Sequence, residues 1–203
     1  MNRFDKIAKE WDAAPRRLKL ARNTYTAIND KVNLHSDMNI LDIGTGTGLL
    51  SMHFITKVKH ITGIDNSQGM LDMLNEKAKN AGVSNISTFL FDADKDILTN
   101  KSYDLAISNM TFHHFIKPEE FLKQVYQNLK PGGKICIADL ETEDGSFHTD
   151  NALDDVKHFG FEKIVFNKWL LEANFKNTNV KTIFEIDRHH KKYPIFMAYG
   201  EKQ

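Results

Sequence analysis

The chain has 203 residues, of which 41% are hydrophobic and 27% are charged, as expected for a globular domain with a continuous core. Lys+Arg and Asp+Glu are equal at 27 each, so no net charge favours nucleic acid or an anionic membrane as a partner. Residues 1–12 lack the apolar core of a signal peptide, and no apolar run approaches the ~20 residues of a transmembrane helix. We therefore expect a cytoplasmic protein that binds neither nucleic acid nor membrane.

Strand and helix signals alternate through the first two thirds of the chain. Helices are expected near the N-terminus over Phe4–Asp12 and Pro15–Val32, and later over Leu49–Thr56, from Met70 toward Ala81, and over Pro118–Leu129. Short apolar runs predict five strands, over Asn39–Ile43, His60–Ile64, Ile86–Phe91, Asp104–Ser108 and, after a Pro131–Gly133 turn, Lys134–Leu140. This alternation implies a parallel, doubly wound sheet with right-handed crossovers.

The last quarter of the chain breaks this alternation. A helix is expected over Glu162–Ala173, followed by two extended segments, Val180–Ile186 and Ile195–Gly200. The polar loop Asp187–Tyr193 between them is too short for a crossover helix, so the last two strands should pair antiparallel. The fold class predicted is α/β: a Rossmann-like, doubly wound, seven-stranded sheet that is mostly parallel and has a C-terminal antiparallel hairpin.

The segment Asn39–Gly48 has the sequence N-I-L-D-I-G-T-G-T-G, a strand followed by glycines and a helical pattern. Such a turn brings bare backbone against a nucleotide-like ligand. Dinucleotide-binding domains prefer G-x-G-x-x-G, whereas here the spacing is G-x-G-x-G and Asp42 lies two residues before the first glycine. A carboxylate there would repel a pyrophosphate and suits an ammonium or sulfonium group instead. Asp65, which ends the second strand, is placed to accept hydrogen bonds from ribose hydroxyls in either class of protein.

Five segments in order resemble motifs of the class I S-adenosylmethionine-dependent methyltransferases. They are Leu41–Gly48, Gly63–Ser67, Phe91–Asp94, Tyr103–Asn109 with His113-His114 following, and Leu129–Lys134. The resemblance is closest to small-molecule members, and the fourth motif is similar to the methyltransferases of quinone biosynthesis. It implies S-adenosyl-L-methionine as the cofactor, N-terminal lid helices, and one domain over 1–203. Within that domain the resemblance implies a lid (1–35), a cofactor-binding core (36–140), and a substrate-side loop, helix and closing hairpin (141–203).

The resemblance also implies roles for individual residues in cofactor binding. Asp42 would hold the methionyl ammonium, and the backbone at Gly44 and Gly46 would approach the methionyl end. Asp65 with Asn66 would hold the ribose. The remaining cofactor-binding residues implied are Met70 on the adenine, Asp92 (with Asp94 as its competitor) and Ala93 at the adenine edge, and Asn109 beside the methionyl group. Gly48 is expected to serve close packing between helix and strand.

His113 and His114 are the candidate catalytic residues, because they follow the fourth strand and a histidine is a suitable base near neutral pH. The favoured alternative is that one of them shapes the pocket while the other faces core or solvent. Asn109 is followed by Met-Thr-Phe, not by the Pro-Pro-aromatic run that resembles the signature of base methylation. A small-molecule acceptor is therefore expected.

Two segments are expected to border the acceptor. Trp11 lies in a segment that resembles a lid helix, although it could equally be a packing aromatic. The polar segment Asp139–His148 follows the fifth strand, with His158 nearby. Asp139, Glu141, Asp144, His148 and His158 could form a metal site, but the spacing favours a substrate-facing polar loop, with His148 and His158 on the substrate side, and no metal is expected.

The function predicted is methyl transfer from S-adenosylmethionine to a small molecule by in-line displacement. An NAD(P)-dependent oxidoreductase and a non-catalytic S-adenosylmethionine-binding protein are the alternatives. The acceptor, its reacting atom, the need for a base and the oligomeric state do not follow from the sequence.

Overall fold

The computed structural model describes residues 3–99, 102–148 and 154–203. In these residues one mixed sheet has the strand order β3-β2-β1-β4-β5-β7-β6. The first five strands pair in parallel, and β7 lies antiparallel between β5 and β6, which confirms the predicted fold class. The strands are β1 (Asn39–Ile43), β2 (His60–Asp65), β3 (Ile86–Leu90), β4 (Tyr103–Asn109), β5 (Leu129–Leu140), β6 (Lys176–Arg188) and β7 (Lys191–Glu201).

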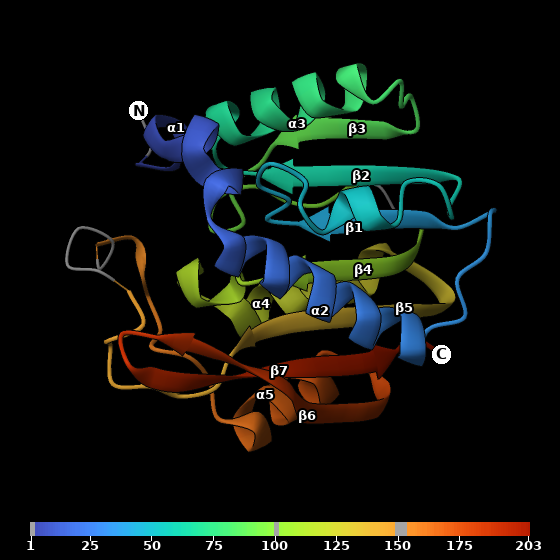
Figure 1. The fold of residues 1–203 in the computed structure, drawn as a ribbon. Coiled ribbons are helices and arrows are strands. Elements are labelled where there is room, and N and C mark those ends of the chain that lie inside the picture. The colour runs from blue at the N-terminus through green and yellow to red at the C-terminus, as the bar shows by residue number, and fades with distance from the viewer. Residues whose placement is uncertain (1–2, 100–101, 149–153) are drawn as a thin grey trace.

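Helices cover both faces of this sheet. The α-helices are α1 (Arg3–Ile7), α2 (Pro15–Lys31), α3 (Gln68–Asn80), α4 (Pro118–Asn128) and α5 (Lys163–Glu172). The short 3-10 helices are η1 (Ala8–Ala13), η2 (Ser51–His53) and η3 (Phe112–His114). Figure 1 shows α2 crossing one face of the sheet, with α4 and α5 behind the other. No helix of the described residues is long and apolar enough to cross a membrane.

Each face of the sheet has its own apolar layer. Phe121 of α4 and Phe166 of α5 are buried in the layer behind the sheet. Ile28 of α2 and Phe54, which follows η2, are buried in the other layer. Burying a side chain of this size contributes about 1.5–3 kcal/mol, so these layers hold the helices against the sheet. The two layers thus fix the strand ends from which the site is built.

The segment after the glycines is not the helix expected over Leu49–Thr56. Only η2 forms there, and the His53 and Phe54 amides donate to carbonyls three residues back instead of four. The Ser51 hydroxyl turns inward and donates to the Asp42 carboxylate at 2.5 Å. Apolar spacing alone could not predict this, because the competing bond is between a side chain and a residue of the preceding strand.

The C-terminal hairpin is longer than expected. The predicted loop Asp187–Tyr193 reduces to a two-residue turn at His189 and His190, with φ of 49° and 61°. This turn was missed because it lacks the Asn-Gly or Asp-Gly signal typical of two left-handed residues. The Pro131–Gly133 turn is likewise incorporated into β5, where the pairing with β4 shifts register.

Candidate active site

A cavity opens at the carboxyl ends of the parallel strands, the edge where sheets of this type bind ligands. In Figure 1, α1 lies at the edge toward which the arrowheads of β1, β2 and β3 point. Thirteen of the fourteen predicted site residues line this cavity: Trp11, Asp42, Gly44, Gly46, Asp65, Asn66, Met70, Asp92, Ala93, Asn109, His113, His114 and His148. The exception is His158, whose Nε2 lies 3.0 Å from the Phe115 carbonyl oxygen.

The glycine turn needs glycine for two separate reasons. Gly44, Gly46 and Gly48 have φ of 65°, 54° and 78°, which side chains rarely adopt. A Cβ on Gly44 would also lie 2.2 Å from the Thr111 side chain, and one on Gly48 would lie 2.2 Å from Leu74 of α3. A Cβ on Gly46 would meet nothing within 4 Å, so its missing side chain leaves backbone open to the cavity.

We expect Gly44→Ala to destabilise the protein by about 2–4 kcal/mol, combining a left-handed alanine with overpacking against Thr111. Gly82→Ala is the matched control, because Gly82 has φ of 67° but its Cβ would meet nothing within 4 Å. The control should lose only about 1–2 kcal/mol. Urea unfolding measures both values, and equal losses would contradict the steric explanation.

Asp42 is a buried carboxylate in the wall of the cavity. Its Oδ2 accepts hydrogen bonds from the hydroxyls of Thr45 (2.8 Å) and Ser51 (2.5 Å). Burial raises the pKa of Asp42 to about 6, against the lowering effect of these two hydroxyls. A carboxylate deprived of water in this way is stabilised by a cationic ligand group.

Asp65 links the glycine turn to the start of α3. Its Oδ2 accepts from the Gly46 amide at 2.8 Å, and its Oδ1 accepts from the Ser67 amide at 2.9 Å. Burial raises the pKa of Asp65 to about 6, despite these backbone donors. Asp65 therefore shapes the turn and also presents an acceptor to the cavity.

The two acids after β3 form hydrogen bonds within their loop and to the segment that follows η3. Asp92 accepts from the Asp94 amide at 3.0 Å and pairs with Lys95 at 2.6 Å, while Asp94 accepts from the Ile116 amide at 2.9 Å. Asp92 and Asp94 both line the cavity, so the geometry leaves the choice between them open. At the end of β4, the Thr24 hydroxyl donates to the Asn109 side-chain oxygen at 2.8 Å and fixes the orientation of that amide.

The N-terminal segment closes over the cavity and is fastened to α3 and the glycine turn. Asp5 accepts from the Ser67 hydroxyl (2.7 Å) and the Gly69 amide (2.9 Å). Asp12 accepts from the Thr47 hydroxyl (2.5 Å) and pairs with Lys77 (2.5 Å). The Arg17 guanidinium lies over the Trp11 ring, with its Cζ 3.6 Å from the centroid of the ring. Trp11 also lines the cavity, so it serves both as a packing aromatic and as part of the cavity wall.

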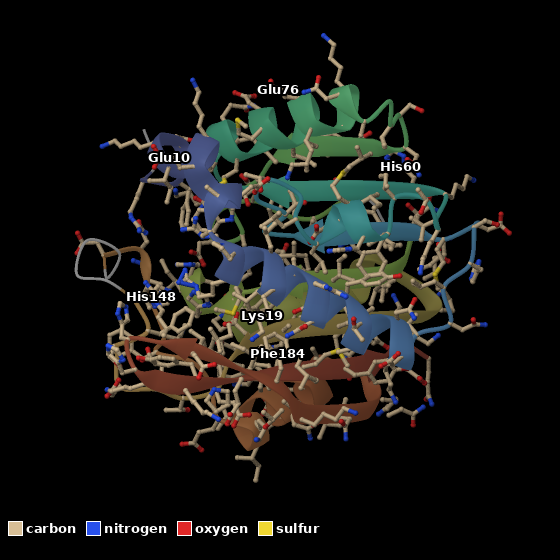
Figure 2. All side chains as sticks on the ribbon, in the orientation of Figure 1. Glu10, Lys19, His60, Glu76, His148 and Phe184 are labelled. Carbon is tan, nitrogen blue, oxygen red and sulfur yellow. The ribbon has the colours of Figure 1, made fainter. Side chains whose placement is uncertain are left out.

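Three histidines from two segments meet in the cavity wall. The ring centroids of His113 and His114 of η3 lie 5.0 and 6.0 Å from that of His148, which Figure 2 labels in the loop after β5. Burial is the main cause that lowers the pKa of His114 well below its ordinary value and the pKa of His148 to about 3. His113 Nδ1 lies 2.7 Å from Asp139 Oδ1, with both side chains buried.

Four arginines also line the cavity: Arg3, Arg16, Arg17 and Arg188. Burial lowers the pKa of Arg16, and burial with the nearby charge of Arg16 lowers the pKa of Arg188 to about 10. The buried Arg16 Nε has no hydrogen-bond partner among the described residues. From the sequence, Arg3, Arg16 and Arg17 were assigned no role, although the adjacent pair Arg16-Arg17 at the start of α2 was an available signal. Arg188 was expected in a solvated hairpin loop, with anion binding as the minor alternative.

Glu141 and Asp144, two of the acids that the sequence offers as metal ligands, pair with lysines instead. Glu141 pairs with Lys163 at 2.8 Å and Asp144 with Lys191 at 2.6 Å. Together with a hydrogen bond between the Ser146 and Tyr193 hydroxyls (2.8 Å), these ion pairs fasten the 141–148 loop to α5 and the hairpin. They hold His148 beside η3.

Comparison with known proteins identifies the family. A profile of the methyltransferase domain matches residues 34–189. An uncharacterized methyltransferase of Schizosaccharomyces pombe is 32% identical over 151 residues, which are 68% of this chain and 53% of that protein. A malonyl-[acyl-carrier protein] O-methyltransferase of Priestia megaterium is 31% identical over 67% of this chain and 49% of its own length. The chain thus spans about half the length of these relatives.

Solved structures share the fold. A SAM-dependent methyltransferase from Aquifex aeolicus superposes with a TM-score of 0.72 at 20% identity over 98% of both chains. A phosphoethanolamine N-methyltransferase from Haemonchus contortus, solved with S-adenosyl-L-methionine, gives 0.74 at 15% identity over 89% of this chain and 52% of that one. By the family profile and the sequence relatives, this chain belongs to the methyltransferase domain family.

Proposed function

We propose that the chain is an S-adenosylmethionine-dependent methyltransferase that acts on a small, anionic acceptor. The observation that carries this proposal is the division of charge in one cavity. The sheet order places three acids side by side: Asp42 near the end of β1, Asp65 as the last residue of the adjacent β2, and Asp92 just after β3. The histidines follow β4 and β5, and Arg188 ends β6 on the other side of β1.

The acidic part suits the cofactor. S-adenosylmethionine carries an ammonium and a sulfonium, and Asp42 is a buried carboxylate that a cation would stabilise. Asp65 presents carboxylate oxygens to a ribose, and the open backbone at Gly46 lets the ligand approach closely. Met70 is buried on α3 and lines the cavity as an apolar surface for a purine ring.

The basic part suits an acceptor with a carboxylate or phosphate group. Arg16, Arg17 and Arg188 present planar guanidinium groups, which bind such anions with paired hydrogen bonds. Two of the compared proteins fit this chemistry, since the Priestia megaterium relative is named for a malonyl group and the Haemonchus contortus structure for phosphoethanolamine, both of which carry acidic groups.

In the chemical step, the main role of the protein is to position the reactants. The sulfonium methyl passes to a nucleophile in line, and the protein must hold donor and acceptor at near-attack distance with water excluded. The lid residues Asp5 and Asp12 keep the N-terminal segment closed over the cavity. His113, held by Asp139, is the candidate base if the acceptor must lose a proton.

Titration calorimetry with S-adenosylmethionine, with NADH in parallel, tests the cofactor assignment. Micromolar binding of S-adenosylmethionine and absent binding of NADH is the expected result. The reverse would favour a nicotinamide-dependent oxidoreductase. Binding without release of S-adenosylhomocysteine across a broad panel of thiols, phenols, amines and acids would favour a non-catalytic cofactor-binding protein.

The acceptor class is tested with matched pairs of compounds, each an acid and its neutral ester or amide. Release of S-adenosylhomocysteine should be at least tenfold faster with the acid. Arg188→Met should remove most of this preference. Lys192→Met, four residues away in the same hairpin and exposed, should keep it. Equal rates for both members of every pair would refute an anionic acceptor.

Cofactor binding should depend on pH through the two buried carboxyls. Both have a pKa of about 6 in the cofactor-free protein, and both must be ionised to receive the ligand. Between pH 7.5 and pH 5 the dissociation constant should rise about tenfold for each carboxyl, because protonation competes with binding. Calorimetry at four pH values measures this dependence, and a flat profile would contradict it.

A further inference from the structure

His113, His114 and His148 bring their imidazole nitrogens together at one point of the cavity wall. One ring nitrogen from each histidine lies within 4.8 Å of a ring nitrogen of the other two. Among the described residues, this is the group of side chains whose ligand atoms lie close enough together to hold a metal ion. His113 and His114 belong to η3, whereas His148 comes from the loop after β5 (Figure 2). The cluster therefore exists only because the fold brings these two segments together.

Two of these rings are oriented by a second hydrogen bond, as metal ligands usually are. His113 Nδ1 lies 2.7 Å from the buried carboxylate of Asp139, which also accepts from the His113 amide. His114 Nδ1 lies 2.7 Å from the Asp155 carbonyl oxygen. Donation from Nδ1 to a carboxylate or carbonyl fixes the tautomer and leaves Nε2 with its lone pair for a metal.

Two of the nitrogens that remain are buried and unsatisfied. His113 Nε2 and His148 Nδ1 have no hydrogen-bond partner among the described residues, and His113 is 1% exposed. A buried polar atom without a partner costs about 1–3 kcal/mol, so it calls for a ligand. A metal ion is one ligand that would satisfy these nitrogens together, because it accepts a lone pair from each imidazole.

We propose that His113, His114 and His148 form a three-histidine site for a divalent transition-metal ion of the zinc class. Imidazole nitrogen suits zinc, copper, iron or nickel, whereas magnesium and calcium prefer oxygen ligands. Around a tetrahedral ion with bonds of about 2.0–2.1 Å, ligand nitrogens lie about 3.3 Å apart. The nitrogens, now within 4.8 Å, need to close by about 1.5 Å at most, a change on the scale of small rotations of the three side chains.

Three protein ligands leave a fourth position, as in catalytic rather than structural zinc sites. All three histidines line the cavity, beside the arginines Arg3 and Arg188. An ion here would offer a position for an acceptor oxygen or sulfur and would lower the pKa of a group bound to it. With an ion bound, His113 would be a ligand, and a group bound to the ion would act as the base in place of His113. The site requires no cofactor assignment, so it stands or falls separately from the proposed function.

Tag-free protein is first dialysed against a chelator to remove metal. Binding of Co²⁺ is then measured by visible absorption, and binding of Zn²⁺ is measured in competition with a chromogenic chelator. We expect one equivalent of each metal to bind and millimolar Mg²⁺ or Ca²⁺ not to compete. His148→Ala and His114→Ala should each raise the dissociation constant at least tenfold. Asp139→Asn, which removes the carboxylate that orients His113, should raise it about 10–100-fold.

The adjacent His189 and His190 in the hairpin turn form the alternative surface site. Both have left-handed φ, which asparagine tolerates, so the double variant His189→Asn/His190→Asn should fold and retain the bound equivalent. Far-UV circular dichroism of each variant confirms folding. Loss of binding in this double variant, unchanged affinity in His148→Ala, or less than a fifth of an equivalent bound would overturn the proposal.

Discussion

Asp42→Asn should stabilise the cofactor-free protein and at the same time weaken S-adenosylmethionine binding. Asparagine keeps an oxygen for the Thr45 and Ser51 hydroxyls, which both donate to Oδ2, removes the charge and replaces the other oxygen by an NH2 group. At pH 7.5 we expect a gain of up to ~3 kcal/mol in the free energy of unfolding. We expect a loss of about 10–100-fold in affinity, because the cofactor ammonium loses its charged partner.

The expected gain follows from the direction of the pKa change. The native pKa of Asp42 is about 6, above the ordinary value of 3.8, so the native state binds the proton more tightly than the unfolded chain. The stability of the cofactor-free protein therefore falls as pH rises from about 4 to about 6 and stays lower above it. Asparagine does not ionise and avoids this loss.

Urea unfolding at pH 4.5 and pH 7.5 measures the effect. The gain from Asp42→Asn should appear at pH 7.5 and largely vanish at pH 4.5, where the wild-type carboxyl is protonated. Asp104→Asn is the contrasting control, because the Asn39 amide and Lys130 counter the effect of burial and lower the pKa of Asp104. That variant should lose stability at pH 7.5. A loss of stability in Asp42→Asn would contradict the assigned desolvation.

Asp65→Ala should abolish most cofactor binding. Two hydrogen bonds from ribose hydroxyls to a carboxylate contribute about 1.5–3 kcal/mol each, so affinity should fall roughly 10²-fold or more. The variant also frees the amides of Gly46 and Ser67, which Asp65 holds at 2.8 and 2.9 Å. Part of the loss will therefore come from a looser glycine turn.

Asp65→Asn separates these two contributions. It keeps one side-chain oxygen for a backbone amide and still lacks the charge, so its affinity should lie between wild type and Asp65→Ala. Asp72→Ala, on the exposed side of α3 beside Gln68, should leave calorimetric binding unchanged. Wild-type affinity in Asp65→Ala would mean that the ribose is held by other residues.

Much of the fold could be predicted because it depends on local patterns. The apolar runs at β1, β2 and β4 are buried on both faces of the sheet, so each appears in the sequence as a continuous hydrophobic segment. The antiparallel hairpin followed from the absence of a crossover between β6 and β7. The two-residue turn of this hairpin and the 3-10 segment after the glycines were not predicted. Hydrophobic spacing indicates neither which residues adopt a left-handed conformation nor that the Ser51 hydroxyl donates to Asp42.

The donor part of the site was predictable for a similar reason. Asp42, Gly44 and Gly46 lie within five residues, so their spacing alone encodes a turn with a carboxylate beside it. The acceptor part is assembled from distant segments. Arg16 comes from α2, His148 from the loop after β5 and Arg188 from β6, and no local pattern links them.

The sequence by itself determined the α/β class, the succession of strands and helices along the chain and the glycine turn expected to hold the cofactor, because these depend on neighbouring residues. Only the tertiary structure decided what faces that turn. Packing of η3 against the 141–148 loop brings three histidines together, and the hairpin carries Arg188 to the cavity. Contacts between residues far apart in the chain leave no periodic pattern in the sequence. The grouping of these histidines and Arg188 around the expected acceptor position could therefore be seen only in the folded structure.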